Sequence, residues 1–573
     1  MVVTKLQNFG GMLPAVDERL LPDNAAAYSE NAWVYSGAVT GINVPTPVYT
    51  CTSDAISKVF RIPKGYSDNV GDSYWLEFVN PDTAVVRAPV VGDTFKRYYW
   101  ASSSSAPRYN TTDRIIAKQS SFLLGIPAPA APNSVTVTGG STAIVVSRAY
   151  VCTYVSAYGE EGPPSPPVTQ TGNQSGNWTI TLPAVGTNDR SERNLAKRRI
   201  YRTITASNGQ ATYFLVAELN IPVSTTATQV YTDSKSDTGI TGAGQLQSTL
   251  WTPPPALSGI IAMPNGMLAG WMENELWFAE PYRPHAWPST YSVAVEYPIV
   301  GLGVIGQTLI VCTQGFPTAA TGVNPASISL SKLSAYEPCL SRGSIVSAPE
   351  GVYYASQNGL VLVAAGQIQN ITRNIITKEK WQELAPVGTL QAARLGTAYY
   401  AYGARRLGGF NPEKFNMEKF SGDDYSGARR GVLVDPQNER VAFNPLADVD
   451  PTANVFNDPW SGEVLLIRSA LVGGVKKSVV YWINTADTNP TYELFKWRSK
   501  EFQLQNRRNL GVMRVWFQTT ATSPELNPTP MTGLDQTVGD DRWGVVRVYA
   551  DGVHVATREL RESGKMFRLP SGF

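Results

Sequence analysis

Short apolar runs separated by tight-turn residues constrain the fold of this chain more than any other feature of its sequence. The clearest example has β-branched and aromatic runs at 351–356 and 360–363, on either side of Asn358-Gly359. Asn-Gly is a strong hairpin signal because both residues tolerate the positive φ angles of a type I′ turn. With a third run at 344–347, the stretch predicts three antiparallel strands of one small sheet, which needs similar neighbours to bury its faces.

The same pattern of short apolar runs and turn residues recurs along the chain. Its clearest turns are at Asn265-Gly266, Gly306-Gln307 and Asn358-Gly359. Their spacing of roughly 40–50 residues is the size of one propeller blade. The chain has 573 residues, too many for one core, and its 49 Gly and 40 Pro supply many turns. We therefore predict an all-β protein built on a distorted β-propeller of short antiparallel sheets, because radial repetition leaves few sheet edges open.

Proline-rich segments at 126–132 and 251–255 bracket a stretch with its own set of strand-like runs. Its passage Tyr-Gly-Glu-Glu-Gly-Pro-Pro-Ser at 158–165 and its Arg-Ile-Tyr-Arg run at 199–202 resemble a fibronectin type III module, and its length of about 100 residues fits a β-sandwich. The expected regions are an N-terminal arm (1–48), the first part of the propeller (49–127), an inserted fibronectin-III-like sandwich (134–246), and the remainder of the propeller with long loops and a C-terminal β region (250–573).

Two short helices are expected in this β protein, near 24–33 with Asp23 or Asn24 as the cap, and at 377–384 with Thr377 as the cap. The Gly-rich start before the first of them has the character of an extended arm. Such an arm either contacts a partner or packs on its own chain. The candidate assembly residues of the arm are Phe9, Arg19 and Trp33.

Two long polar segments, 405–430 and 443–460, carry aromatic residues and are expected to be loops. Loops of that length in a compact fold are usually functional or mobile. Their aromatic side chains either meet a partner or pack locally. The candidate gate or contact residues are Phe410, Phe415, Phe420, Tyr425 and Trp460.

The residues that carry chemistry are sparse in this sequence. It has no Walker-type loop, no HExxH and no GxSxG, and its two histidines are far apart. The four cysteines, Cys51, Cys152, Cys312 and Cys339, are distant in sequence and form no CxxC, so we expect buried reduced thiols. We expect a non-enzymatic protein without cofactor or metal, and we find no catalytic, cofactor-binding or metal-binding residue to nominate.

Charge and hydropathy narrow the class of partner. The formal net charge is +2, and no polybasic run favours tight binding to nucleic acid or to a membrane surface. No apolar leader opens the chain, and no apolar run has the length of a transmembrane helix. We expect synthesis in a cytoplasm and no membrane insertion by this chain.

Five passages spread over most of the chain outside the sandwich, at 8–22, 268–288, 297–303, 354–363 and 497–500, resemble the tail nozzle (tail tubular protein B) family of short-tailed bacteriophages. The resemblance implies a structural virion protein that forms a six-fold ring, the homo-hexameric distal DNA channel of the tail. It also implies synthesis in the bacterial host, contacts with a tail tubular A-like portal-adaptor ring and with tail fibres or spikes, and a part in genome retention and ejection.

The near-neutral charge is compatible with such a channel, because a strongly basic wall would hold the passing DNA instead of touching it transiently and without specificity. The alternative is a non-enzymatic receptor- or carbohydrate-binding propeller, such as a tail-tip adhesin, with aromatic side chains as platforms for sugars. Oligomeric state distinguishes the two, since a nozzle closes six-fold and adhesins are commonly trimers.

Overall fold

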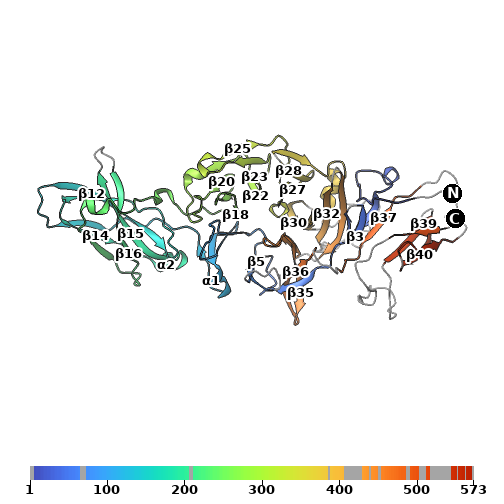
Figure 1. Ribbon diagram of the computed structural model, residues 1–573, viewed down its shortest axis with the longest axis horizontal. Helices are drawn as coiled ribbons and strands as arrows, with labels where there is room; N and C mark the ends of the chain where they lie inside the picture. Colours follow the sequence, from blue (N-terminus) through green and yellow to red (C-terminus); the bar gives the residue numbers. More distant parts are fainter. Residues whose placement is uncertain are drawn as a thin grey trace, which may run out of the picture.

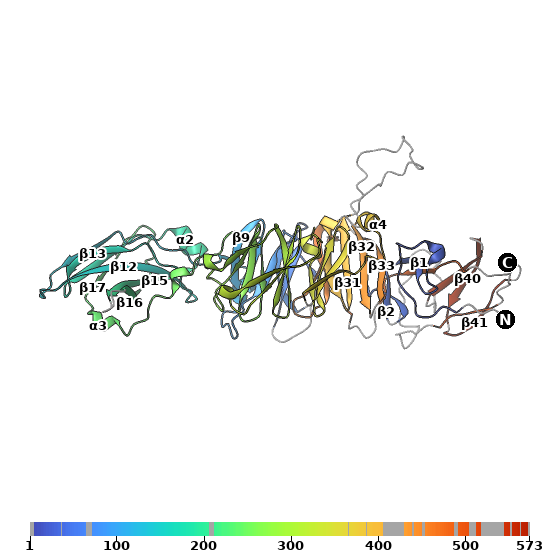
Figure 2. The same cartoon turned by 90° about the horizontal axis from the view of Figure 1, so that it is seen from above.

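The computed structural model describes residues 5–35, 37–64, 72–205, 211–364, 366–384, 387–404, 429–437, 440–449, 453–485, 491–502, 512–516, 544–550, 553–561 and 563–570. Strands make up most of the regular structure, which confirms the all-β prediction. The molecule is elongated, with a sandwich at one end, a ring of small sheets in the middle, and strands from both ends of the chain at the other (Figures 1 and 2).

Seven antiparallel sheets, counted within the described ranges, form the ring, and we number them as blades one to seven. First strands of successive blades contact one another, as β7 (Ala84–Arg87) does with β18 (Gly259–Ala262) and β26 (Val346–Ala348) does with β30 (Gln391–Leu395), which places them innermost. From the innermost strand outward, the blades are β5 (Lys58–Pro63) and β6 (Ser73–Phe78); β7 (Ala84–Arg87), β8 (Arg97–Ser102), β9 (Ser105–Thr111) and β10 (Phe122–Leu123); β18 (Gly259–Ala262), β19 (Leu268–Met272), β20 (Glu275–Phe278) and β21 (Ser292–Ala294); β22 (Ile299–Ile305), β23 (Thr308–Thr313), β24 (Thr318–Thr321) and β25 (Ser329–Lys332); β26 (Val346–Ala348), β27 (Gly351–Ser356), β28 (Gly359–Ala364) and β29 (Gln367–Asn370); β30 (Gln391–Leu395), β31 (Ala398–Ala404), β32 (Arg429–Gln437) and β33 (Arg440–Val449); and β34 (Asn454–Asn457), β35 (Val464–Val472), β36 (Val475–Ile483) and β4 (Thr46–Thr50).

Hydrophobic clusters between neighbouring blades close the ring. Each pair of adjacent blades shares one cluster, so every sheet buries both of its faces. Starting between blades seven and one, the clusters include Val59 with Leu465, Phe60 with Tyr98, Tyr99 with Leu268, Leu276 with Val311, Ile310 with Tyr354, Leu360 with Tyr399, and Tyr400 with Leu466. The fold is therefore a distorted seven-bladed propeller with one two-stranded blade.

Strands from distant parts of the chain join in the last blade. Its three inner strands come from residues 454–483, and its outer strand is β4, whose Thr50 pairs with Val479 of β36. This pairing makes part of the expected N-terminal arm a propeller strand. Backbone hydrogen bonds thus close the ring between the beginning of the chain and its last third.

The hairpin predicted around Asn358-Gly359 is present, but its turn type is not the expected one. Ser356 pairs with Gly359, so Gln357 and Asn358 are the loop residues, and only Gly359 among these has a positive φ, of 144°. Asn358 uses its amide to donate to Glu337 Oε2 at 3.0 Å instead of adopting a left-handed conformation. The neighbouring landmark Asn265-Gly266 does have two positive φ angles, 63° and 72°.

The inserted fibronectin-III-like sandwich lies between β10 and β18 along the chain and consists of a three-stranded and a four-stranded antiparallel sheet. Trp178, Ile180 and Ile200 are fully buried between the sheets. Arg202 and Asp233 form a buried ion pair of 2.7 Å in the same core. The strands are β11 (Ser134–Thr138), β14 (Asn177–Leu182) and β17 (Gln229–Asp233) in one sheet, and β13 (Val168–Asn173), β12 (Val145–Ser156), β15 (Leu195–Thr205) and β16 (Ala211–Asn220) in the other.

Of the two expected helices, one is confirmed and one is wrong. Helix α4 (Lys378–Leu384) has Thr377 Oγ1 accepting from the Lys380 amide, as a cap does. Residues 24–33 instead enter strands β1 (Ala26–Glu30) and β2 (Ala32–Tyr35). Asn31 between these strands has a φ of 53°, which a helix does not tolerate, and strand pairing elsewhere in the chain satisfies the β1 backbone.

The expected loop at 443–460 is also wrong, because β33 and β34 occupy most of it. Phe443 and Val455 are buried core residues, whereas the polar Asn444 and Asn454, also buried, obscure the apolar alternation in the sequence. The other expected loop follows β31, and Ala404 of β31 pairs with Arg429 of β32. Phe410, Phe415, Phe420 and Tyr425 lie outside the described residues.

The other helices are short, and small two-stranded sheets complete the described structure. These elements are η1 (Glu18–Leu20), α1 (Thr112–Ile116), α2 (Thr187–Glu192), α3 (Asp237–Ile240), η2 (Ser248–Leu250), η3 (Ser289–Tyr291), η4 (Pro325–Ser327), η5 (Arg342–Ser344), η6 (Val387–Thr389), β3 (Ala38–Gly41), β37 (Lys496–Ser499), β38 (Val512–Arg514), β39 (Gly544–Ala550), β40 (Val553–Leu560) and β41 (Met566–Arg568).

Candidate assembly platform and gate residues

Segments from the two ends of the chain form one small β unit, which we call the terminal platform and define as residues 5–45 with 491–502. Strand β1 pairs antiparallel with β37, and β2 pairs with β3. The backbone of Ile42 accepts from the Glu493 amide at 2.7 Å, which extends the pairing beyond the strands. The platform therefore owes its structure to pairing between residues more than 450 positions apart, since Ser29 lies opposite Trp497.

Trp497 is the centre of this unit. Its ring meets the ring of Phe9 edge to face, with centroids 4.8 Å apart and an interplanar angle of 89°. Its indole nitrogen donates to the Gly10 carbonyl at 3.0 Å. Nearby, the Lys500 ammonium donates to the Leu21 carbonyl at 2.9 Å and pairs with Asp23. Edge-to-face aromatic pairs add about 0.5–1.5 kcal/mol to the burial of the rings, so Trp497 fixes the arm to the C-terminal strand.

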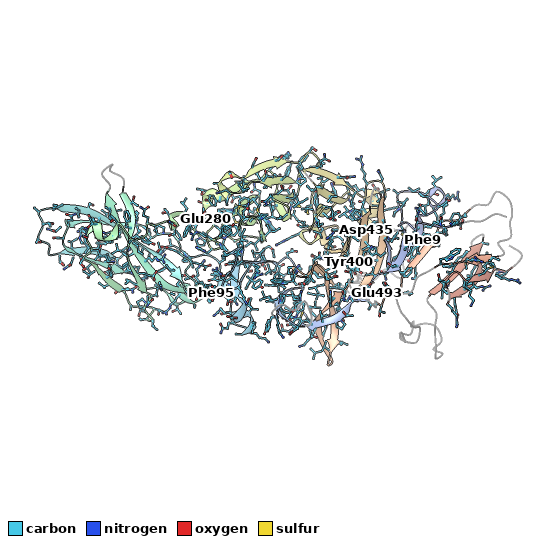
Figure 3. The ribbon with its side chains drawn as sticks, in the orientation of Figure 1. Phe9, Phe95, Glu280, Tyr400, Asp435 and Glu493 are labelled. Carbon is cyan, nitrogen blue, oxygen red and sulfur yellow. The ribbon has the colours of Figure 1, made fainter. Side chains whose placement is uncertain are left out.

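The platform is also attached to the outer strand of blade six. The Met12 amide donates to the Phe443 carbonyl at 2.8 Å, and the Ala15 amide donates to the Ile375 carbonyl at 2.8 Å. A Cβ on Gly11 would lie 2.5 Å from the Phe443 nitrogen, so only glycine lets the arm approach this strand. Figure 3 shows Phe9 in the platform and Asp435 in the neighbouring blade.

The three candidate arm residues differ in their environments. Phe9 is half-buried against Trp497, and Trp33 is half-buried with its indole nitrogen donating to Asp435 Oδ2 at 3.2 Å. Arg19 is exposed in η1, where its amide caps onto Asp17 Oδ1 at 3.0 Å. Phe9 and Trp33 thus follow the alternative in which the arm packs on its own chain, and Arg19 is the candidate that faces solvent.

Trp460 lies at the junction between the last and first blades. It is 41% exposed, its indole nitrogen donates to the Arg61 carbonyl at 2.8 Å, and the Arg87 guanidinium lies 5.4 Å from its ring centre. These contacts hold Trp460 against blades one and two. The other candidate gate residues, all between 410 and 425, lie outside the described residues.

Two cations that no sequence pattern distinguishes lie beside innermost strands, Lys58 at the start of β5 and Arg342 in η5 next to β18. Lys58 begins β5 with its ammonium 4.0 Å from the Phe456 ring, and Arg342 donates to the Ser258 carbonyl at 2.7 Å. Burial, with a smaller contribution from the charge of Arg342, lowers the pKa of Lys58 to about 8, while Asp82 opposes the shift. Burial lowers the pKa of Arg342 as well. A lone lysine in a strand-like run carries no signal that distinguishes such a position.

The loop at 158–161 attaches the sandwich to the propeller. Tyr158 packs against Phe95 with centroids 4.5 Å apart, and Glu160 Oε1 accepts from Arg97 Nη1 at 2.6 Å. His285 of blade three lies with Nδ1 3.8 Å from the same carboxylate, and burial lowers its pKa. Figure 3 shows Phe95 at this joint. The passage that suggested a fibronectin type III loop is thus the passage that anchors the sandwich.

All four cysteines are buried and free. Cys312 and Cys339 lie in the cluster between blades four and five, where the neighbouring Cys339 and burial raise the pKa of the Cys312 thiol. Across the described ranges, no group of three or more His, Cys, Asp or Glu side chains is arranged to hold a metal ion. In the same ranges, no helix has the length and apolar character needed to cross a membrane.

The fold and its attachments define a class of protein, a seven-bladed β-propeller with an inserted sandwich and a platform built from both chain ends. No protein-family model and no curated protein matches the sequence. Similar solved structures include the N-terminal domain of Nup159 (8% identity, 49% of this chain and 71% of that chain, TM-score 0.24), the AfRom2 CNH domain (9%, 50% and 94%, 0.19) and apo AztD from Citrobacter koseri (10%, 58% and 99%, 0.22). Similarities this remote carry no argument about the function of this chain.

Proposed function

We propose that this chain is the nozzle subunit of a short phage tail, a structural protein that closes into a six-fold ring around the distal DNA channel and takes part in genome retention and ejection. One observation supports this most. The passages at 8–22 and 497–500, which resemble the nozzle family, meet in the terminal platform through the Phe9–Trp497 contact and the pairing of β1 with β37.

The physical requirements of the role agree with the chain. A ring of identical subunits needs a rigid body with a different surface on each side, and a propeller with interblade cores and two lateral attachments provides one. The net charge of +2 does not favour tight DNA binding, which would slow ejection. The proposed partners of this subunit are the portal-adaptor ring and the tail fibres or spikes.

Labelling of virions tests the location. Gly139 is a suitable position for a short epitope, because its turn has a φ of 68° and open space around it. In particles produced from the genome that encodes this chain, antibody against the epitope should decorate the distal part of the short tail. Untagged particles are the control. Decoration of the capsid, or no virion-associated epitope at all, would contradict the proposal.

The adhesin alternative predicts a different result in the same experiment. An adhesin would place the epitope at a tail tip or fibre. Particles that lack an adhesin subunit would stay filled and intact but would not adsorb to cells. A nozzle subunit is instead required for retaining DNA, so particles lacking it should contain little genome. Filled, stable particles that merely fail to adsorb would favour the adhesin.

A further inference from the structure

The hairpin of β35 and β36 in blade seven ends in an exposed apolar tip. Leu471, Val472 and Val475 are 77%, 40% and 58% exposed, around a turn at Gly473-Gly474 with φ angles of 58° and 80°. Exposed aliphatic surface is unfavourable by about 25 cal/mol per Å². Figure 1 shows this hairpin projecting from the bottom of the propeller. Three branched side chains at a projecting tip indicate a contact surface.

The same tip carries positive charge on a rigid base. Lys476 pairs across the hairpin with Leu471, and Lys477 follows it, so both lie beside the apolar side chains. Further down the hairpin, Val479 and Val480 are buried in the blade. The tip is thus presented at a defined position and needs little ordering on binding.

A groove of about 520 Å³, which we call the platform groove, lies where the terminal platform meets α4 and blade six. Several of its apolar lining side chains are partly exposed to solvent. Two exposed carboxylates, Asp17 and Glu18, also line the groove. The Lys380 ammonium at its wall donates to the Pro14 carbonyl at 2.5 Å, and Glu18 pairs at the surface with Arg498 at 3.4 Å. The apolar lining residues include Met12, Leu13, Val16, Leu21, Phe443 and Pro445.

We propose that the tip at 471–477 of one copy docks in the platform groove of a second copy of this chain, with Lys476 and Lys477 facing Asp17 and Glu18. The apolar side chains of the tip meet the apolar lining of the groove. The two lysines face the carboxylates of the groove, whose own Lys380 is held by the Pro14 carbonyl. Hairpin and platform lie on different sides of the molecule in Figure 1, at the bottom and at the right, so the contact is head to tail between copies. Repetition of such a contact closes a ring when the rotation between copies is a whole fraction of a turn, one sixth for the proposed nozzle.

This inference rests on the proposed ring and names the surfaces that build it. A disulfide test addresses it directly. With Leu471→Cys and Val16→Cys in one full-length chain, mild oxidation should produce a ladder of covalent oligomers that ends at the ring. The native cysteines are buried, so they should not contribute. Leu471→Cys with Val323→Cys, which is 68% exposed in another blade, is the matched control and should give no ladder.

Charge reversal supplies a second readout. Lys476→Glu with Lys477→Glu should weaken ring formation at least about tenfold, which corresponds to about 1.4 kcal/mol per contact. Adding Glu18→Lys should restore part of it, and a merely misfolded variant would not be rescued in this way. Unchanged rings in the double charge variant would overturn the proposal.

The outcomes separate this inference from the proposed function. Rings that form without the 16–471 cross-link leave the nozzle proposal standing and overturn the docking surface. Absence of rings in the unaltered protein overturns the nozzle proposal itself. If Leu471→Asp leaves rings intact but abolishes binding to vesicles of phosphatidylglycerol and phosphatidylethanolamine, the tip serves a membrane surface and the docking proposal is wrong.

Discussion

Arg61 and Asp458 join the first and last blades of the propeller through a buried ion pair. Arg61 Nη2 lies 2.6 Å from Asp458 Oδ2, and the two side chains are 1% and 0% exposed. The pair spans 397 positions of sequence, and Asp458 also accepts from the amide and hydroxyl of Ser461. Ring closure thus combines this pair with the hydrogen bonds between β4 and β36.

Asp458→Asn should destabilise the propeller strongly. The variant leaves the Arg61 guanidinium buried without its counter-charge, which typically costs about 3–5 kcal/mol. The free energy of unfolding, measured by urea denaturation, checks it. Arg61→Met combined with Asp458→Asn should cost less than Asp458→Asn alone, because no unpaired charge remains. If the single and double variants lose the same free energy of unfolding, the unpaired Arg61 charge is not the cause of the loss.

Lys58→Met should stabilise the protein at neutral pH. The pKa of Lys58 is lowered from 10.5 to about 8 in the folded state, so the unfolded chain binds more protons between these values and stability rises with pH through that window. Below this pH window, burial of the charged Lys58 destabilises the folded state by about 3 kcal/mol, as the pKa shift implies. The attraction between the ammonium and the Phe456 ring offsets part of this destabilisation. We expect a gain of about 2 kcal/mol at neutral pH.

The same variant has a distinctive pH dependence. Its advantage over the unaltered protein should fall to less than half at about pH 9.5, because Lys58 is then mostly neutral when folded. Lys64→Met, whose side chain is 42% exposed, is the control and should change stability little at either pH. A gain that does not depend on pH would show that packing, not charge burial, is responsible.

Tyr158→Ala with Glu160→Gln should loosen the joint between sandwich and propeller without unfolding either. The change removes the contact with Phe95 and one of the two carboxylate partners of Arg97, which keeps its pair with Asp93. Small-angle X-ray scattering should report a wider range of dimensions. Gln170→Ala, on the exposed surface of the sandwich, should leave the scattering unchanged. An unchanged profile for the double variant would mean that other contacts hold the joint.

Removal of the sandwich should leave a folded propeller. A Cβ on Gly125 would lie 2.6 Å from the Pro253 Cα, so the two connecting segments run side by side and a short bridge closes them. A chain lacking 128–250, with Gly-Ser between Pro127 and Trp251 and with Ile126→Ser, should keep its far-UV β signature and a cooperative thermal transition. An insoluble product would mean that the propeller needs the sandwich.

Local patterns were sufficient to predict strands, turns and helix α4, because apolar runs, Asn-Gly and a Thr cap act over a few residues. Closure of the ring was not predictable in this way. Pairing of Thr50 with Val479 leaves no mark in either neighbourhood, so the number of blades and the role of β4 emerge only from the structure. Propensity failed at 24–33, where pairing with β37 determines the conformation.

In the candidate site, too, local features were predictable from the sequence and long-range contacts were not. Phe9 and Trp33 were identified as aromatic residues in an arm, but their partners, Trp497 and Asp435, lie hundreds of residues away. The depth of Lys58 depends on how seven sheets surround an axis, which composition does not reveal. Buried Asn444 and Asn454 masked two strands as a polar loop, since strand patterns assume polar residues outside.

The mass and image of the purified full-length protein test the central claim most directly. Mass photometry together with negative-stain electron microscopy should show closed six-fold rings with a central opening and a mass near six times 62.2 kDa. Monomers at every concentration, or trimers as an adhesin would form, would contradict the nozzle account.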